Sequence, residues 1–105
     1  MNNNESFLIK LTTRETLLCI IAESTESSVT VAFPYVLTCN KKGKIKLQKW
    51  LPCADEQIFT ISYNDIVTIA ETNQALNERY NQLLISHHDL DSGFPSSYSN
   101  IFGRN

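Results

Sequence analysis

The stretch Phe7–Glu23, FLIKLTTRETLLCIIAE, carries the pattern that decides the fold. Apolar residues occupy alternate positions over Phe7–Leu11, which is the period of a β-strand with one face on a core. The polar residues Thr12–Glu15 interrupt this pattern and predict a tight turn. The next segment, Leu17–Ala22, is apolar on both faces, so we expect each face of that strand to be covered by another part of the chain.

Strand patterns continue along the chain as far as Ala70. Apolar residues alternate from Val29 and continue to Cys39, but Pro34 has no amide proton and predicts an edge, a bulge or a sharp bend. Asn40–Gly43 is a hairpin signal, because its glycine allows a positive φ angle. Further strands are expected at Lys44–Trp50, Gln57–Ser62 and Ile66–Ala70, with a short corner at Tyr63–Asp65 between the last two.

The hydrophobic period changes from that of a strand to that of a helix after Thr72. Four apolar residues then follow one helical stripe, with Thr72 or Asn73 as the N-cap and an end near Ser86: Leu76, Tyr80, Leu83 and Leu84. Residues 1–86 therefore predict a mainly β (α+β) domain, a strongly bent five- to six-stranded antiparallel sheet or small barrel with one C-terminal helix. Residues 87–105 are rich in Ser, Gly, Asn and Pro, which predicts a flexible or docking tail.

The composition limits the class of protein. A chain of 105 residues fits one domain, and a formal net charge of −2 gives no global attraction to nucleic acid or anionic membranes. The longest apolar run has six residues, whereas a membrane-spanning helix needs about 20, so no membrane partner is expected. Asn2–Glu5 does not resemble the start of a signal peptide. We expect a cytoplasmic protein, located in the host cytoplasm if a phage encodes it.

The chain offers no recognisable catalytic or cofactor site. Cys19, Cys39 and Cys53 are separated by 20 and 14 residues without a C-x-x-C pair, so we expect reduced, mostly buried thiols and no metal. No serine or cysteine has a base at motif spacing, and three glycines form no phosphate-binding loop. His87 and His88 adjoin two aspartates, but a helix C-terminus that favours cations explains them without a metal. We predict that the protein is not an enzyme and binds no cofactor.

A cluster of lysines is the one unusual feature of the composition. Five of the nine basic residues lie within nine positions and are followed directly by Trp50: Lys41, Lys42, Lys44, Lys46 and Lys49. Basic charge beside an aromatic ring is typical of single-stranded nucleic-acid binding. The alternative interpretation is an edge strand that its lysines protect from aggregation.

The tail also carries a distinctive set of side chains. Four apolar residues stand among small polar ones: Phe94, Tyr98, Ile101 and Phe102. Isolated aromatic residues of this kind either dock on a partner or a neighbouring subunit, or belong to a terminus with no binding role.

Three segments resemble the motifs of a known family. Ile9–Leu17 is similar to the opening of the first Sm motif, Ser28–Phe33 to the third strand of that motif, and Ile61–Ile69 to the second motif. The chain thus resembles the Sm-like family over about residues 7–85. It is most similar to a divergent branch of short Sm-like proteins from phages and environmental sequences, which share three further elements with it: Phe33-Pro34, Trp50–Pro52 and the helix around Asn77–Leu84.

The resemblance implies a homo-oligomeric ring of about five to seven subunits that binds RNA. Two family features are missing, however. The Asp-x-x-x-Asn feature that holds uridine has no match near Glu23–Ser28, and Ser62–Asn64 replaces an Arg-Gly corner. Only Asn64, and Tyr63 as a stacking ring, can be carried over. Arg14 stands where the family turn prefers glycine, which implies a different turn geometry.

Two functions from different classes remain. The first is a ring-forming module that binds RNA or single-stranded DNA through the lysine cluster, Trp50, Tyr63 and Asn64. The second is a non-catalytic oligomeric scaffold whose tail docks a protein partner. Binding that weakens steeply with added salt favours the first function. Indifference to nucleic acid, with loss of the oligomer or partner when residues 89–105 are deleted, favours the second.

Overall fold

The computed structural model describes residues 5–88 and contains six strands, one short 3₁₀ helix and one α-helix. The elements are β1 (Phe7–Leu11), β2 (Thr16–Ser24), β3 (Ser28–Cys39), β4 (Ile45–Lys49), β5 (Ile58–Ser62), η1 (Tyr63–Asp65), β6 (Ile66–Glu71) and α1 (Gln74–His88). The helix begins directly after Asn73, whose Oδ1 accepts a hydrogen bond from the backbone N–H of Leu76 at 2.8 Å. Of the two predicted N-cap residues, Asn73 is therefore the one that caps the helix.

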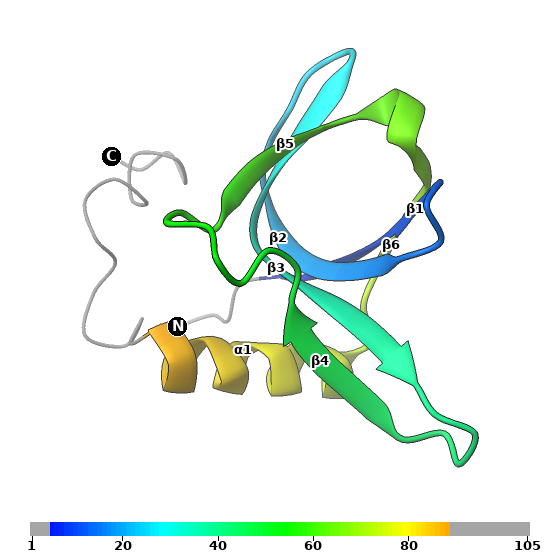
Figure 1. Cartoon of the computed structure of the whole chain (residues 1–105), viewed down its shortest axis with the longest axis vertical. Coiled ribbons are helices and arrows are strands. Elements are labelled where there is room, and N and C mark those ends of the chain that lie inside the picture. The colour runs from blue at the N-terminus through cyan, green and yellow to red at the C-terminus, as the bar shows by residue number, and fades with distance from the viewer. Residues whose placement is uncertain (1–4, 89–105) are drawn as a thin grey trace.

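All strand pairs of the sheet are antiparallel. The order is β4-β3-β2-β1-β6, and β5 pairs with the first half of β3. The sheet curls strongly, and the short helix η1 connects β5 to β6 at the point where the curl comes round (Figure 1). Within residues 5–88 no β5–β6 pairing closes the curl. The predicted bent sheet with one C-terminal helix is confirmed, and the curl is not a closed barrel.

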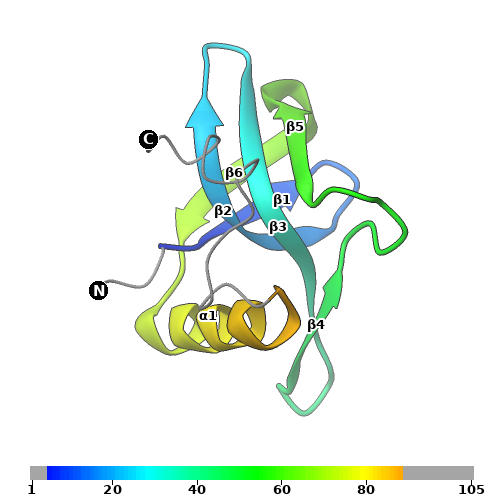
Figure 2. The same ribbon diagram turned by 90° about the vertical axis from the view of Figure 1, so that its left-hand side faces the viewer.

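The curled sheet has a core on each face. The inner core lies inside the curl and contains Leu17 and Cys19 of β2. The outer core lies between the sheet and α1 and contains Leu18 and Ile20 of the same strand. Figure 2 shows α1 lying against this second face, below the sheet. The prediction that both faces of β2 are covered is therefore confirmed.

The long strand β3 changes partner and direction at its centre. Its first half pairs with β5 and its second half with β4, and Phe33 between them has a φ of +52°. Val31 belongs to the inner core, whereas Phe33 and Tyr35 belong to the outer core, so the alternation of the strand reverses here. Pro34 thus marks a bulge and a bend, as predicted. The side chains from Phe33 onward do not continue the alternation of Val29 and Val31, because the positive φ of Phe33 reverses the two faces.

Hydrogen bonds from two neighbouring turns of α1 attach the helix to the rest of the domain. The buried hydroxyl of Tyr80 donates to the carbonyl oxygen of Phe33 at 2.7 Å. Three residues earlier in the helix, Asn77 Oδ1 accepts from both the N–H and the hydroxyl of Ser6, at 2.8 and 2.6 Å. The Ser6 hydroxyl also lies 2.7 Å from that of Thr72. The helix is therefore held both at the bend of β3 and at the start of the first strand.

The turn between β1 and β2 adopts the geometry that a glycine would adopt. Arg14 has a φ of +84°, almost the same as the +82° of Gly43 in the β3–β4 turn. The expectation that Arg14 changes the turn is wrong. The turn geometry is held by the backbone hydrogen bonds from Leu11 N–H to Glu15 O and from Arg14 N–H to Leu11 O, each 2.9 Å long.

Replacing Arg14 by glycine is expected to raise the free energy of unfolding by about 1 kcal/mol, because it removes the strain of a positive φ at a residue with a Cβ. The matched reverse change is Gly43→Ala, which has open space around its new Cβ and is expected to cost about 1 kcal/mol. Urea denaturation measures both. A stabilising Gly43→Ala, or a destabilising Arg14→Gly, would contradict the left-handed conformation at these positions.

Candidate nucleic-acid interface

The lysine cluster lies on a hairpin that projects beyond the body of the domain (Figure 1). We call residues 38–49 the lysine hairpin. Its turn is held by Asn40, whose Oδ1 accepts from the backbone N–H groups of Lys42 and Lys44, both at 2.9 Å. The Asn40 carbonyl also accepts from Gly43 N–H at 2.9 Å. These bonds leave the lysine side chains of the turn exposed on an ordered backbone.

The lysines of the hairpin point to both of its faces. Along β4, Lys46 and Gln48 are exposed, while Ile45, Leu47 and Lys49 alternate with them and are half-buried. Leu47 packs against the outer core, so Lys49 lies on the side of the strand that faces α1. Lys46 and Gln48 therefore lie on the face of β4 opposite to Ile45 and Leu47. The positive charge therefore surrounds the hairpin instead of covering one face.

Trp50 has a packing role at the base of the hairpin. Its backbone N–H donates to the carbonyl of Pro34 at 3.1 Å, and its ring packs on the inner core. The ring meets Phe59 edge-on, with centroids 5.7 Å apart and an angle of 82° between the planes. Trp50 also borders an opening of about 370 Å³ that the carboxylates of Glu15 and Asp65 share. The described charged residues that line this opening are thus both acidic.

Tyr63 and Asn64 lie at η1, on the opposite side of the molecule from the tip of the lysine hairpin (Figure 1). The Ser62 hydroxyl caps this turn by accepting from Asn64 N–H at 3.1 Å. Tyr63 N–H donates to the carbonyl of Ser27 at 3.0 Å, which places the β2–β3 loop beside the corner. Tyr63 is half-buried against the inner core and Asn64 is exposed. The structure therefore divides the predicted binding residues between two separate places.

The two places differ in charge. The lysine hairpin contains five lysines and no carboxylate, whereas the rest of residues 5–88 contains three basic residues against nine acidic ones. Around the η1 corner, Glu23, Glu26 and Asp65 are exposed. The small net charge of the chain thus hides a strong separation of charge. A polyanion is attracted to the hairpin and repelled from the corner.

One basic residue that lies beside the hairpin is not indicated by the sequence pattern. Arg79 of α1 donates from Nη2 to the carbonyl oxygen of Ile45 in β4 at 3.0 Å. The guanidinium thus lies next to the lysine hairpin, more than 30 positions away along the chain. The helical period shows that Arg79 is off the apolar stripe of α1, but only the packing of α1 beside β4 shows which surface it joins.

The cysteines differ from their prediction. Cys19 is buried, and burial raises the pKa of its thiol to about 12. Cys39 and Cys53 are both exposed, so the expectation of mostly buried thiols is wrong. Cys39 ends β3 where the hairpin leaves the body, and Cys53 lies in the loop after β4, so neither position reaches a core.

The described part of the chain shows neither a cluster of metal ligands nor a helix that could span a membrane. Residues 5–88 contain no group of three or more His, Cys, Asp or Glu side chains placed to hold a metal ion. No helix in that range combines the length and the apolar character that crossing a membrane requires. The first two residues of the predicted tail belong to the end of α1. The side chains of His87 and His88, and residues 89–105 with Phe94, Tyr98, Ile101 and Phe102, lie outside what the structure describes.

A strongly bent antiparallel sheet, with a 3₁₀ corner before its last strand and a helix across one face, defines the class of small β-domains to which this chain belongs. The model of the Sm-like domain matches residues 8–81. The chain is therefore a member of the Sm-like family. Sm-like domains are small, generally non-enzymatic modules that form oligomers and often bind RNA. No curated protein matches the chain.

Proposed function

We propose that this protein is a ring-forming, non-catalytic Sm-like module of the cytoplasm that binds RNA or single-stranded DNA through its lysine hairpin. The observation that carries the proposal is the concentration of five lysines, without a carboxylate, on an exposed and internally hydrogen-bonded hairpin. Such a group of cations attracts the phosphate backbone whatever the base sequence. The protection of an edge strand explains exposed lysines on β4, but not their continuation around the turn at Lys41 and Lys42.

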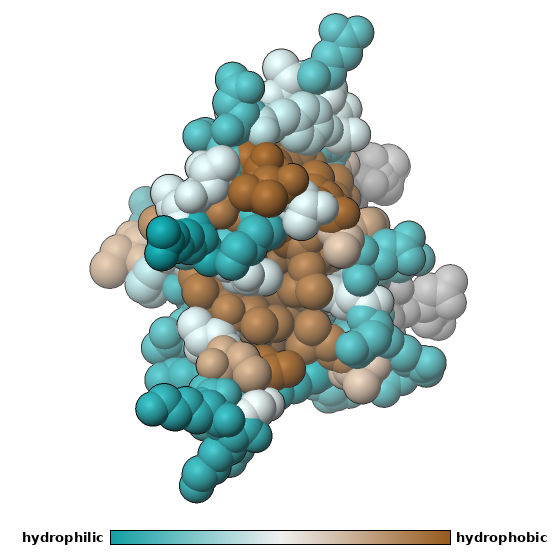
Figure 3. All heavy atoms as spheres, turned by 90° about the vertical axis from the view of Figure 1, so that its right-hand side faces the viewer, coloured by the Kyte–Doolittle hydropathy of each residue, from teal (hydrophilic) through white to brown (hydrophobic). Residues whose placement is uncertain are grey.

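Assembly is supported by the edges of the curled sheet. In the described part of the chain, β6 pairs only with β1 and β5 pairs only with β3, so each has one unpaired edge. On β6, Val67 and Ile69 are 63% and 36% exposed. Figure 3 shows apolar side chains gathered on the face of the molecule at the side of β1 and β6. Pairing of β5 with β6 of the next copy would cover these groups and, repeated head to tail, would close a ring of about five to seven subunits.

The binding surface of the proposed ring is the hairpin rather than the η1 corner. Asn64 is exposed and the ring of Tyr63 is half-buried. We therefore propose both side chains as secondary contacts for a base. The carboxylates of Glu23, Glu26 and Asp65 make that corner unfavourable for phosphate. This protein would then differ from relatives that hold uridine at the corresponding loops.

The proposal predicts a loss of binding when the hairpin loses its charge. The variant Lys42→Gln/Lys44→Gln/Lys46→Gln is expected to bind oligouridine or oligothymidine of about 15 nucleotides at least 10-fold more weakly at low salt. The slope of log affinity against log salt is negative, and its magnitude is expected to fall by about 2, because three cations no longer displace counterions. Fluorescence anisotropy of the labelled oligonucleotide measures both quantities.

A charge-matched control separates this site from a general effect of net charge. Lys10→Glu/Arg14→Gln lowers the net charge by the same amount at the β1–β2 turn and is expected to bind as the wild type does. Equal binding by the hairpin variant and the wild type would refute the proposed site. If the wild type binds neither oligonucleotide at low salt, and deletion of residues 89–105 removes an oligomer or a partner, the protein is instead an interaction scaffold.

A further inference from the structure

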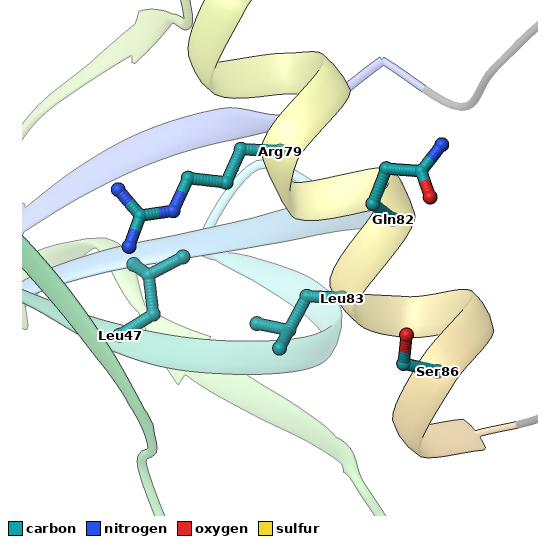
Figure 4. Close-up of a pocket in the computed structure, with 5 residues that line it drawn as sticks. All are labelled: Leu47, Arg79, Gln82, Leu83 and Ser86. Atoms are coloured by element: carbon teal, nitrogen blue, oxygen red, sulfur yellow. The ribbon is translucent and has the colours of Figure 1, made fainter.

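A groove runs between α1 and β4 beside the lysine hairpin. It has a volume of about 230 Å³ and is lined by Leu47 of β4 and by Arg79, Gln82, Leu83 and Ser86 of α1. The four helix residues are spaced by one, three or four positions and share one face of the helix. Figure 4 shows the two leucine side chains between the strand and the helix, and the guanidinium of Arg79 reaching toward β4. The groove thus has an apolar floor and a polar rim.

The rim offers hydrogen-bond donors and one positive charge. The described residues that line the groove include the guanidinium of Arg79, the amide of Gln82 and the hydroxyl of Ser86, and none of them is a carboxylate. A guanidinium carries five N–H donors, and the contact with the Ile45 carbonyl uses Nη2. That contact orients the planar group beside the strand. The planar fork of an arginine fits two oxygens of a phosphate better than a lysine does.

The groove continues the charge of the lysine hairpin onto the helix. Lys49 lies on the α1-facing side of β4 together with Leu47, while Lys46 lies on the opposite side. Glu78, the acidic neighbour of Arg79, accepts a hydrogen bond from Gln74 Nε2 at 3.3 Å, one turn earlier in the helix. A linear polyanion held by the hairpin can therefore pass over β4 into the groove without meeting a carboxylate of its lining.

We infer that this groove is a phosphodiester subsite, in which Arg79 contacts a phosphate of the strand that the lysine hairpin binds. The inference rests on the proposed function, because it extends the same binding surface. Gln82 and Ser86 supply neutral donors to the same backbone, and the leucines exclude water beneath it. The subsite makes binding depend on α1 as well as on the hairpin. An acidic peptide is the competing occupant and is distinguished by the test.

The test compares two arginines in the full-length chain. Arg79→Gln is expected to weaken oligouridine binding about 3- to 10-fold at low salt and to reduce the salt slope by about 0.7, the value for one phosphate contact on a single strand. Arg14→Gln removes an exposed arginine from the distant β1–β2 turn and is expected to leave both quantities unchanged. Arg79→Lys keeps the charge, so it is expected to restore the slope but not the full affinity.

A second variant avoids the structural contact of Arg79 with Ile45. Ser86→Glu places a carboxylate on the rim and is expected to weaken oligouridine binding at least 3-fold while thermal unfolding, followed by circular dichroism, stays close to that of the wild type. If Arg79→Gln and Ser86→Glu bind like the wild type while the lysine variant loses binding, the groove inference is wrong and the proposed function stands. If the lysine variant also binds normally, the proposed function fails. Displacement of the oligonucleotide by oligoglutamate at equal charge concentration would overturn the phosphodiester assignment.

Discussion

Tyr80→Ala is expected to lower the free energy of unfolding by about 4 kcal/mol, because it removes the largest fully buried side chain of the outer core and leaves a cavity. Tyr80 is completely buried and meets Tyr35 edge-on, with ring centroids 6.2 Å apart. Its hydroxyl donates to the carbonyl of Phe33, the residue with a positive φ at the bend of β3. The side chain therefore joins the helix to the bend of β3, where Phe33 has a positive φ.

Tyr80→Phe separates the hydrogen bond from the packing. The ring remains in place, so the expected loss is only about 1 kcal/mol. Glu78→Ala, an exposed change on the same helix, is expected to stay within about 0.5 kcal/mol of the wild type. Urea denaturation at neutral pH measures all three. A loss below about 2 kcal/mol for Tyr80→Ala would mean that α1 does not pack on the bend as described.

The same tyrosine gives the stability a pH dependence. Burial raises the pKa of Tyr80 well above its ordinary value, with smaller contributions from Cys19 and Tyr35. A raised folded-state pKa means that the unfolded chain loses the proton first as the pH rises. The contribution of Tyr80 is therefore complete below the ordinary tyrosine pKa of about 10 and declines above it. Burial raises the pKa of the Cys19 thiol from 9.0 to about 12, so its contribution declines in the same direction but starts to be lost nearer pH 9.

Val67→Glu is expected to convert the proposed ring into monomers at micromolar concentration. Val67 is 63% exposed on β6, so the folded monomer tolerates the change within about 0.5 kcal/mol. In the ring, strand pairing would place this side chain against the neighbouring copy. A carboxylate buried there without a partner costs at least about 2 kcal/mol at every interface, and a ring repeats that cost in each subunit.

Light scattering after size-exclusion chromatography measures the mass of the particle. Gln48→Glu introduces the same charge on exposed β4, away from the β5 and β6 edges, and is expected to leave the mass unchanged. A wild-type protein that stays strictly monomeric at high concentration would refute the ring. An oligomer that survives Val67→Glu would show that the edge of β6 is not the contact between copies.

The strands and the helix could be predicted because their evidence is local. The alternation of β1, the two apolar faces of β2 and the stripe of α1 each follow from spacing along a few residues. The conformations of Phe33 and Arg14 could not be predicted in this way. A hydropathy pattern contains no information on the backbone angle φ. Both residues have a positive φ, a conformation that is ordinarily found at glycine. The resulting reversal of β3 places Tyr35 in the outer core, whereas Val29 and Val31 of the same strand belong to the inner core.

The candidate site shows the same division. The lysine cluster is visible in the sequence, because its five members are neighbours along the chain. Arg79 could not be assigned to it, since the contact with Ile45 joins residues 34 positions apart. Trp50 is predicted as a stacking surface beside the lysines, and the structure adds that its half-buried indole meets Phe59 edge-on. That outcome depends on the direction in which the chain leaves β4, which no local pattern specifies.

The sequence by itself determined that this protein is a bent β-sheet with one helix and a cluster of lysines, because periodicity and charge are properties of neighbouring residues. Only the tertiary structure decided where those charges act. Curling the sheet carries the η1 corner and its carboxylates away from the hairpin, while the docking of Tyr80 brings Arg79 beside β4. A chain with a net charge of −2 therefore carries a basic hairpin that is separated from the carboxylates of the η1 corner, because the fold and not the total charge decides which charges are neighbours.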